Sequence, residues 1–208
     1  MLQDSYHLFA SVLAISILHA ILPNHWLPVV AISKKLGWNS RKTAGVTMLA
    51  ALAHSLSTVI IGILLAFGGM KLDDILPYFR FIAAGILIAL GILFVWRHQH
   101  HMHFHLREVA LTSNATTGYI LGSLLLAMFL SPCLEVGALF LVSGTEGMKV
   151  TFVVAIIYTL TSAAGMTLFA WAAMQGLKKM DWHKLEHSSG LISGIILILT
   201  GIMFLFFD

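Results

Sequence analysis

The sequence has very little charge and almost no cysteine. Only 10% of its 208 residues are Asp, Glu, Lys or Arg, whereas 59% are hydrophobic, and the mean hydropathy is +0.92. A water-soluble domain carries about 25% charged residues, so the composition excludes that class. The lone Cys133 excludes an internal disulfide and leaves the redox compartment unreadable. The composition therefore predicts an integral membrane protein.

Long polar stretches are also lacking, and apolar segments account for nearly the whole chain. A transmembrane helix needs about 20 predominantly apolar residues, and no Lys or Arg precedes the first segment as in a signal peptide, so we expect that segment to be retained. We predict one all-α integral membrane domain over residues 1–208. Its six predicted transmembrane helices are 7–32, 44–68, 77–97, 117–143, 150–174 and 187–207.

Positive charge is distributed unevenly over the predicted loops. Of twelve Lys and Arg, nine follow spans one, three and five, and three lie on the opposite side. Because basic loops remain in the cytoplasm, both termini are predicted outside, in a multi-pass protein of the cell inner membrane. Loops that face anionic lipid account for the net charge of +3. The lipid bilayer is thus a predicted partner, and nucleic acid is not.

A weak internal repeat divides the chain. Residues 86–96 resemble 195–207, residues 22–33 resemble 131–143, and residues 53–58 fall opposite 157–162. With an odd number of spans in each unit, the second enters the membrane from the opposite side, an arrangement that recurs in transporters. Repeat 1 is about 7–97, a loop is about 98–116, and repeat 2 is about 117–207. The matches align Gly91 with Gly201, Pro23 with Pro132, and His54 with Tyr158.

The stretch "HAILPNHWLP" (19–28) places helix breakers beside metal-capable side chains. Pro23 and Pro28 each lack an amide donor, which predicts a kinked or unwound helix between them. On a straight helix, His19 and His25 would diverge by about 120°. Unwinding at Pro23 lets both imidazoles and the Asn24 oxygen converge on one metal ion. The alternative is that each histidine hydrogen-bonds a neighbouring carbonyl as packing glue between helices.

Further polar residues lie in predicted spans. His54 in span two is followed by Ser55, Ser57 and Thr58, and Glu135 is ionisable deep in an apolar segment, which marks a functional hypothesis. Cys133 is either a soft ligand or a small packing residue, with packing favoured. The predicted metal ligands are His19, Asn24, His25, His54 and Glu135, with Cys133 as a weaker candidate.

These motifs resemble those of the nickel and cobalt transporters. "HAILPNH" (19–25) is similar to their HxxxxDH signature with Asn24 in place of aspartate, and "AHSLSTVI" (53–60) is similar to their GHSTVV segment. "SPC" (131–133) and the loop "RHQHHMHFH" (97–105) look like features of the nickel/cobalt efflux permeases. The resemblance implies a permease of the lysine-exporter superfamily that moves nickel, cobalt or zinc as substrate, with no organic cofactor. Glu135 would supply the charge that Asn24 lacks.

The histidine-rich loop indicates weak, exchangeable metal capture, and on the predicted cytoplasmic side it slightly favours export. Its alternative is an interfacial segment with incidental histidines. Association with further copies of the chain is left open. The loop histidines are His98, His100, His101, His103 and His105.

Two other functions stay open. The thiol-disulfide carriers of cytochrome c biogenesis are similar in their two inverted halves and proline-cysteine motif, but disulfide exchange needs a cysteine pair and this chain has one cysteine. The other is an accessory protein that delivers metal. No GxSxG or HExxH motif is present, so an enzyme is not predicted.

Overall fold

The computed structural model describes residues 2–69, 76–99, 117–131, 133, 136–176 and 182–206. In these residues the regular elements are helices and no strand is present, which confirms the predicted all-α class. Each helix overlaps a predicted apolar span. The helices are α1 (Leu2–Ile21), α2 (Pro23–Lys35), α3 (Ser40–Gly69), α4 (Leu76–Gln99), α5 (Thr117–Phe129), α6 (Gly137–Thr145), α7 (Met148–Gly176) and α8 (Trp182–Phe206).

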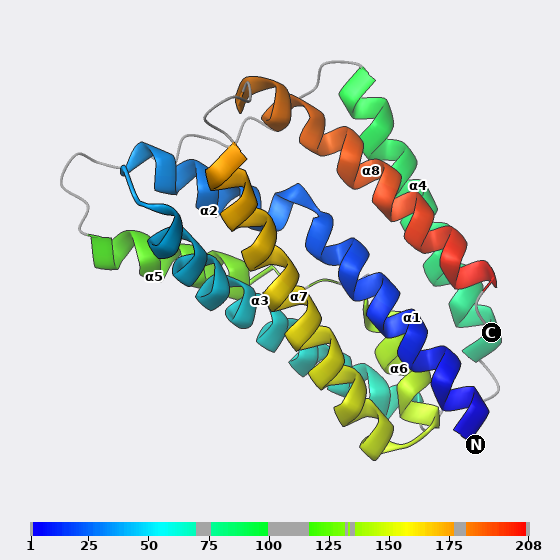
Figure 1. Ribbon diagram of the computed structural model, residues 1–208. Helices are drawn as coiled ribbons and strands as arrows, with labels where there is room; N and C mark the ends of the chain where they lie inside the picture. The colour runs from blue at the N-terminus through cyan, green and yellow to red at the C-terminus, as the bar shows by residue number, and fades with distance from the viewer. Residues whose placement is uncertain are drawn as a thin grey trace.

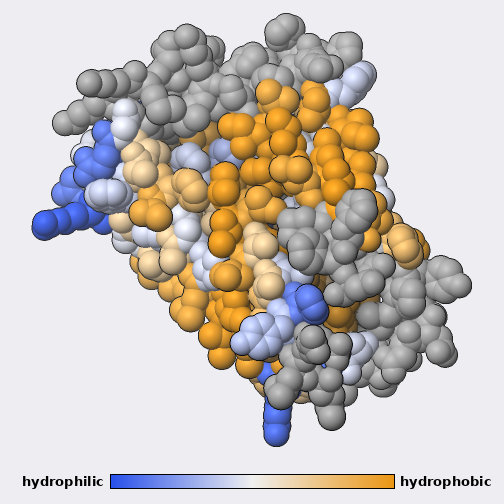
Figure 2. All heavy atoms as spheres, turned by 45° about the vertical axis from the view of Figure 1, so that its right-hand side comes forward, coloured by the Kyte–Doolittle hydropathy of each residue, from blue (hydrophilic) through white to orange (hydrophobic). Residues whose placement is uncertain are grey.

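Several helices have the length and composition to cross a membrane. Three stretches qualify outright, namely Tyr6–Lys35, Ser40–Gly68 and Met148–Gly176. Shorter apolar helices lie at Ala84–Trp96, Thr117–Phe129 and Leu191–Ile202. Large apolar side chains are exposed along these helices, and Figure 2 shows a broad hydrophobic surface between hydrophilic edges. Such a surface is stable in lipid and costly in water, which indicates a membrane protein.

The first predicted span is broken at one residue. Helix α1 ends at Ile21, and α2 begins at Pro23, whose missing amide costs nothing at a helix start. Backbone carbonyls at the break accept hydrogen bonds from nearby residues. The Leu22 amide donates to the His19 carbonyl oxygen at 3.1 Å, and the Trp26 indole donates to the Ile21 carbonyl oxygen at 3.4 Å. Of the two predicted forms of the break, kinked or unwound between Pro23 and Pro28, the unwound form is wrong, since α2 continues through Pro28. A helix interior can lose one hydrogen bond where neighbouring helices surround it.

The fourth predicted span is broken as well. Helix α5 ends at Phe129 and α6 begins at Gly137, with Cys133 in the connection. Pro132 and Glu135 lie outside the described residues. Two broken helices therefore stand at corresponding places in the two halves of the chain.

The helices pack in a pattern that repeats. Helix α1 contacts α7 as α5 contacts α3, and α2 contacts α7 as α6 contacts α3. Likewise the contact of α2 with α8 corresponds to that of α6 with α4. Helices α3 and α4 each contact their own counterparts in the second half, α7 and α8. Figure 1 shows that the members of both of these pairs run in opposite directions. Exchanging the first four helices for the last four thus reproduces these contacts, whereas the smaller contacts of α1 with α6 and α8 have no counterpart of similar extent among the described residues.

Glycines set the close approach of α4 and α8. A Cβ added to Gly91 would lie 2.6 Å from the Gly194 carbonyl oxygen and 2.6 Å from a carbon of Ile198. One added to Gly201 would lie 2.9 Å from the Ala84 carbonyl oxygen and 2.7 Å from Ile88. Gly91 and Gly201 are 110 residues apart. The same offset pairs Ala84 with Gly194 and Ile88 with Ile198, so the two glycines make corresponding contacts.

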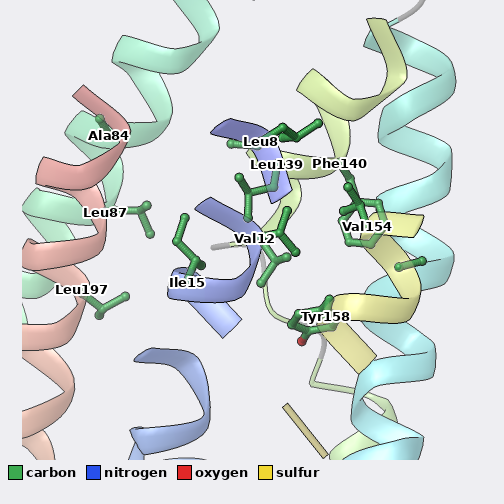
Figure 3. Packing of buried hydrophobic residues seen from close by; sticks show 13 residues of the cluster. Leu8, Val12, Ile15, Ala84, Leu87, Leu139, Phe140, Val154, Tyr158 and Leu197 are labelled. Atoms are coloured by element: carbon green, nitrogen blue, oxygen red, sulfur yellow. The ribbon is translucent and has the colours of Figure 1, made fainter. Parts of the chain in front are cut away.

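The main hydrophobic core surrounds α1. Figure 3 shows Val12 and Ile15 of α1 between Leu87 and Leu197 on one side and the residues of α6 and α7 on the other. Tyr158 of α7 belongs to this core and is fully buried. This packing holds the end of α1 beside the middle of α3 and α7, where the polar residues described next are found.

Candidate metal centre

Four metal-capable side chains meet at the two helix breaks. His19 comes from the last turn of α1, His25 from the first turn of α2, His54 from α3, and Cys133 from the connection between α5 and α6. One ligand atom from each lies within 4.8 Å of every other. Residues up to 114 positions apart in sequence thus form a single cluster, which we call the His3Cys cluster.

The break at Leu22 is what brings His19 and His25 together. Their ring centroids lie 4.4 Å apart, although on a continuous helix the two side chains would diverge by about 120°. The His54 ring lies 4.7 Å from that of His25 and 5.4 Å from that of His19. His19 and His25 therefore converge as predicted, and the helix is interrupted at Leu22 alone.

Hydrogen bonding assigns the tautomers of the neutral rings. The Met128 carbonyl oxygen can only accept, so Nδ1 of His54, 3.4 Å away, donates to it. His54 Nε2 is then bare and accepts from Nε2 of His19 at 3.2 Å. His19 Nδ1 remains an acceptor for the Cys133 thiol, whose sulfur is 3.5 Å away. This single orientation satisfies all three contacts.

The three histidines of the cluster are buried. The exposed fractions of His19, His25 and His54 are 1%, 7% and 0%. In the described part of the chain, no carboxylate joins the group. Helices α1 and α5 bring their carbonyl ends to the breaks while α2 and α6 bring their amide ends, so the helix dipoles oppose one another. The donor atoms of the described cluster are imidazole nitrogens and a cysteine sulfur, a donor set of the kind that transition-metal cations accept.

Tyr158 is a residue of the site that sequence reasoning did not select. Its hydroxyl oxygen lies 3.4 Å from Nε2 of His19, and its ring centroid lies 5.8 Å from that of His19. The available signal was the repeat, which aligns Tyr158 with His54. The contacts correspond too, because His54 reaches Met128 in α5 as Tyr158 reaches His19 in α1, and positions 19 and 128 are 109 residues apart, like the aligned Pro23 and Pro132.

The remaining predicted site residues lie elsewhere or are not described. The Asn24 side chain is exposed, in contrast to the buried histidines on either side of the break, and we leave it out of the ligand set. Glu135 lies outside the described residues. His98 occupies the last turn of α4 with no described side chain, and the other loop histidines, His100, His101, His103 and His105, lie outside the described residues.

No protein-family model matches the chain, and neither curated proteins nor solved structures match it. The geometry of the His3Cys cluster and the sequence motifs that form it are therefore the features that bear on function.

Proposed function

We propose that the protein is a permease of the cell inner membrane that moves a divalent transition-metal cation: nickel, cobalt or zinc. The observation that carries the proposal is the convergence of three buried imidazoles at a broken helix. Structural metal sites do not require a helix break inside a membrane, whereas transporters place their ion sites at such breaks near the midplane. The cluster lies at two such breaks, between two broken helices and two continuous ones, which supports the proposal.

The architecture proposed for transport is six spans in two inverted three-helix halves, with both termini outside. The matching neighbours of α1 to α4 and α5 to α8, and the antiparallel course of α3 and α7, support this arrangement. So does the exchange of contacts between Gly91 and Gly201. In such a permease the halves rock about the site and open it to each side in turn. The histidine-rich loop would collect cytoplasmic ions for export.

The ion needs lone-pair donors on several sides, and hydrogen bonds hold two of the rings in place for it. His54 is held by Met128 and presents Nε2. His19 presents Nδ1 toward Cys133. When a metal ion occupies the cluster and replaces the hydrogen bonds between its ligands, Nε2 of His19 donates to the Tyr158 hydroxyl. Hydrogen-bond partners of this kind fix the orientation of metal-bound histidines. Tyr158 is therefore a positioning residue for His19.

Ion flux in proteoliposomes tests the proposal directly. Vesicles that contain the purified protein and an entrapped metal-sensitive dye are expected to take up zinc, cobalt or nickel faster than empty vesicles, with saturation as the external ion rises. Manganese and magnesium, which prefer oxygen ligands, serve as control ions. Stoichiometric metal binding without flux would contradict transport and favour the accessory, metal-delivering alternative.

Replacing Tyr158 by phenylalanine is expected to weaken metal binding roughly 10 to 100-fold, the usual effect of losing a hydrogen-bond partner of a metal-bound histidine. The ring remains, so the packing of Tyr158 against Phe140 is kept, with centroids 6.4 Å apart. Competition with a chelating dye measures the affinity. Tyr119→Phe on α5, where the side chain is exposed, is the matched control. Equal affinities of the Tyr158→Phe and Tyr119→Phe proteins would remove Tyr158 from the site.

A further inference from the structure

Cys133 is the member of the His3Cys cluster that comes from the second half of the chain. We infer that its thiolate is the fourth ligand, and that the site therefore selects a zinc-like cation that accepts tetrahedral nitrogen and sulfur coordination. The inference rests on the proposed function and narrows its substrate class. It makes the chain's single cysteine part of the ion site instead of a packing residue.

The distances around the sulfur support coordination. Zinc bonds of about 2.3 Å to sulfur and 2.0–2.1 Å to nitrogen place tetrahedral ligands roughly 3.6 Å apart for sulfur with nitrogen and 3.3 Å for two nitrogens. Cys133 Sγ lies 3.5 Å from His19 Nδ1 and 3.7 Å from His25 Nε2. Both match the tetrahedral edge. The largest ligand separation, up to 4.8 Å, requires the fourth side chain to close in as the ion binds.

The position of Cys133 is held by the helix that carries His54. The Cys133 amide donates to the Thr58 hydroxyl at 3.1 Å, and that hydroxyl donates to the His54 carbonyl at 3.1 Å. Thr58 is one turn beyond His54 on α3 and is 2% exposed. This backbone hydrogen bond, made outside any helix, holds the residue that carries the sulfur beside α3 and next to His54.

The origin of the fourth ligand also accounts for release. Three neutral histidines and one thiolate make a closed four-coordinate set, which is typical of sites that hold zinc permanently. Here the histidines belong to the first half, and Cys133 belongs to the second. Movement of one half against the other removes one ligand and opens the coordination shell. A tight site can thus still deliver its ion.

The donor set distinguishes between ions. As the sulfur–metal bond forms, the thiol S–H bond breaks and its proton passes to bulk water, so loading is favoured for metals that prefer thiolate. Zinc and tetrahedral cobalt accept three nitrogens and one sulfur, whereas manganese and magnesium prefer oxygen, and octahedral nickel leaves two positions unfilled. We expect zinc to bind more tightly than nickel at this site.

Cobalt spectroscopy on the full-length purified protein tests the ligand. Reduced protein titrated with Co²⁺ without oxygen is expected to show strong visible bands of tetrahedral cobalt and a near-ultraviolet thiolate-to-cobalt band, both lost on adding Zn²⁺. In Cys133→Ser the thiolate band disappears, and affinity falls at least as far as the roughly 10 to 100-fold loss expected for a hydrogen-bond partner of a ligand. Adding Ser131→Cys to that variant moves the thiol to an exposed position and is not expected to restore the band.

Alkylation of the wild-type thiol gives a second measurement that does not depend on any variant. Cys133 is half-buried, and because it is the single cysteine, labelling by a maleimide reports on it alone. Zn²⁺ is expected to slow the labelling at least tenfold, and Mn²⁺ is not. Cobalt bound without a thiolate band, labelling unchanged by Zn²⁺, or nickel bound more tightly than zinc would each overturn the inference and leave the permease standing. Failure to bind Co²⁺, Ni²⁺ or Zn²⁺ at all would overturn both.

Discussion

Replacing His54 by glutamine is expected to reduce metal flux in proteoliposomes to the level of empty vesicles, with loss of stoichiometric metal binding. His54 has no exposed surface, and its Nε2 lies 3.2 Å from His19 Nε2 at the middle of the cluster. Glutamine has a side chain of similar length and polarity and removes the imidazole lone pair. Because carboxamides are poor ligands for zinc-like ions compared with imidazole, the effect falls on binding rather than on folding.

The matched control is His7→Gln on α1. His7 is exposed and belongs to the same helix as His19, so the substitution removes an imidazole from the chain without touching the cluster. Binding stoichiometry by metal analysis and flux by dye fluorescence are both measured, along with thermal unfolding in detergent. Wild-type flux in the His54→Gln protein would exclude the cluster as the ion site. A matching loss in His7→Gln would show that the measurement responds to histidine content alone.

Replacing Gly91 by valine is expected to prevent α4 and α8 from packing and to lower the thermal unfolding temperature sharply. The atoms that the new Cβ would meet are the Gly194 carbonyl oxygen at 2.6 Å and the Ile198 amide nitrogen at 2.9 Å. Both belong to backbone, which cannot rotate aside, so the helices must separate. Overpacking of this kind costs about 1–3 kcal/mol where side chains can adjust, and more is expected here.

Gly85→Val is the control for that substitution. Gly85 lies on the same helix, and a Cβ added there meets nothing within 4 Å. Both variants therefore replace a helical glycine by valine, but only Gly91→Val introduces a clash. Unfolding followed by fluorescence in mild detergent, with size-exclusion chromatography, compares the two proteins. Equal unfolding temperatures would show that α4 and α8 do not depend on close contact at Gly91. The same comparison applies to Gly201, whose added Cβ would meet the Ala84 carbonyl oxygen at 2.9 Å.

The helices were predictable from composition because lipid leaves the backbone few choices. In hydrocarbon, amide and carbonyl groups must pair within the chain, so each long apolar run becomes a helix. The predicted spans 44–68 and 150–174 accordingly lie within α3 and α7. The interruption of the first span was also predictable, since Pro23 lacks the amide that a continuous helix requires there. Pro28 has the same chemistry, and its local sequence could not reveal that α2 continues through it.

The membership of the site depended on tertiary structure. His19 and His25 were linked by local sequence, but whether Asn24 also turned inward depended on how α2 leaves the break, and it lies exposed. Tyr158 and Cys133 lie 139 and 114 residues from His19, and no periodicity encodes contacts over such distances. Tyr158 meets His19 where α7 packs closely on α1, since a Cβ added to Gly165 would lie 2.5 Å from the Ala20 Cβ, and Cys133 meets it because Thr58 holds the Cys133 backbone. The sequence by itself determined the apolar helices and the position of the first break, because backbone hydrogen bonding in lipid is a local requirement. The tertiary structure decided which side chains share the cluster, because that depends on interhelical packing between distant parts of the chain.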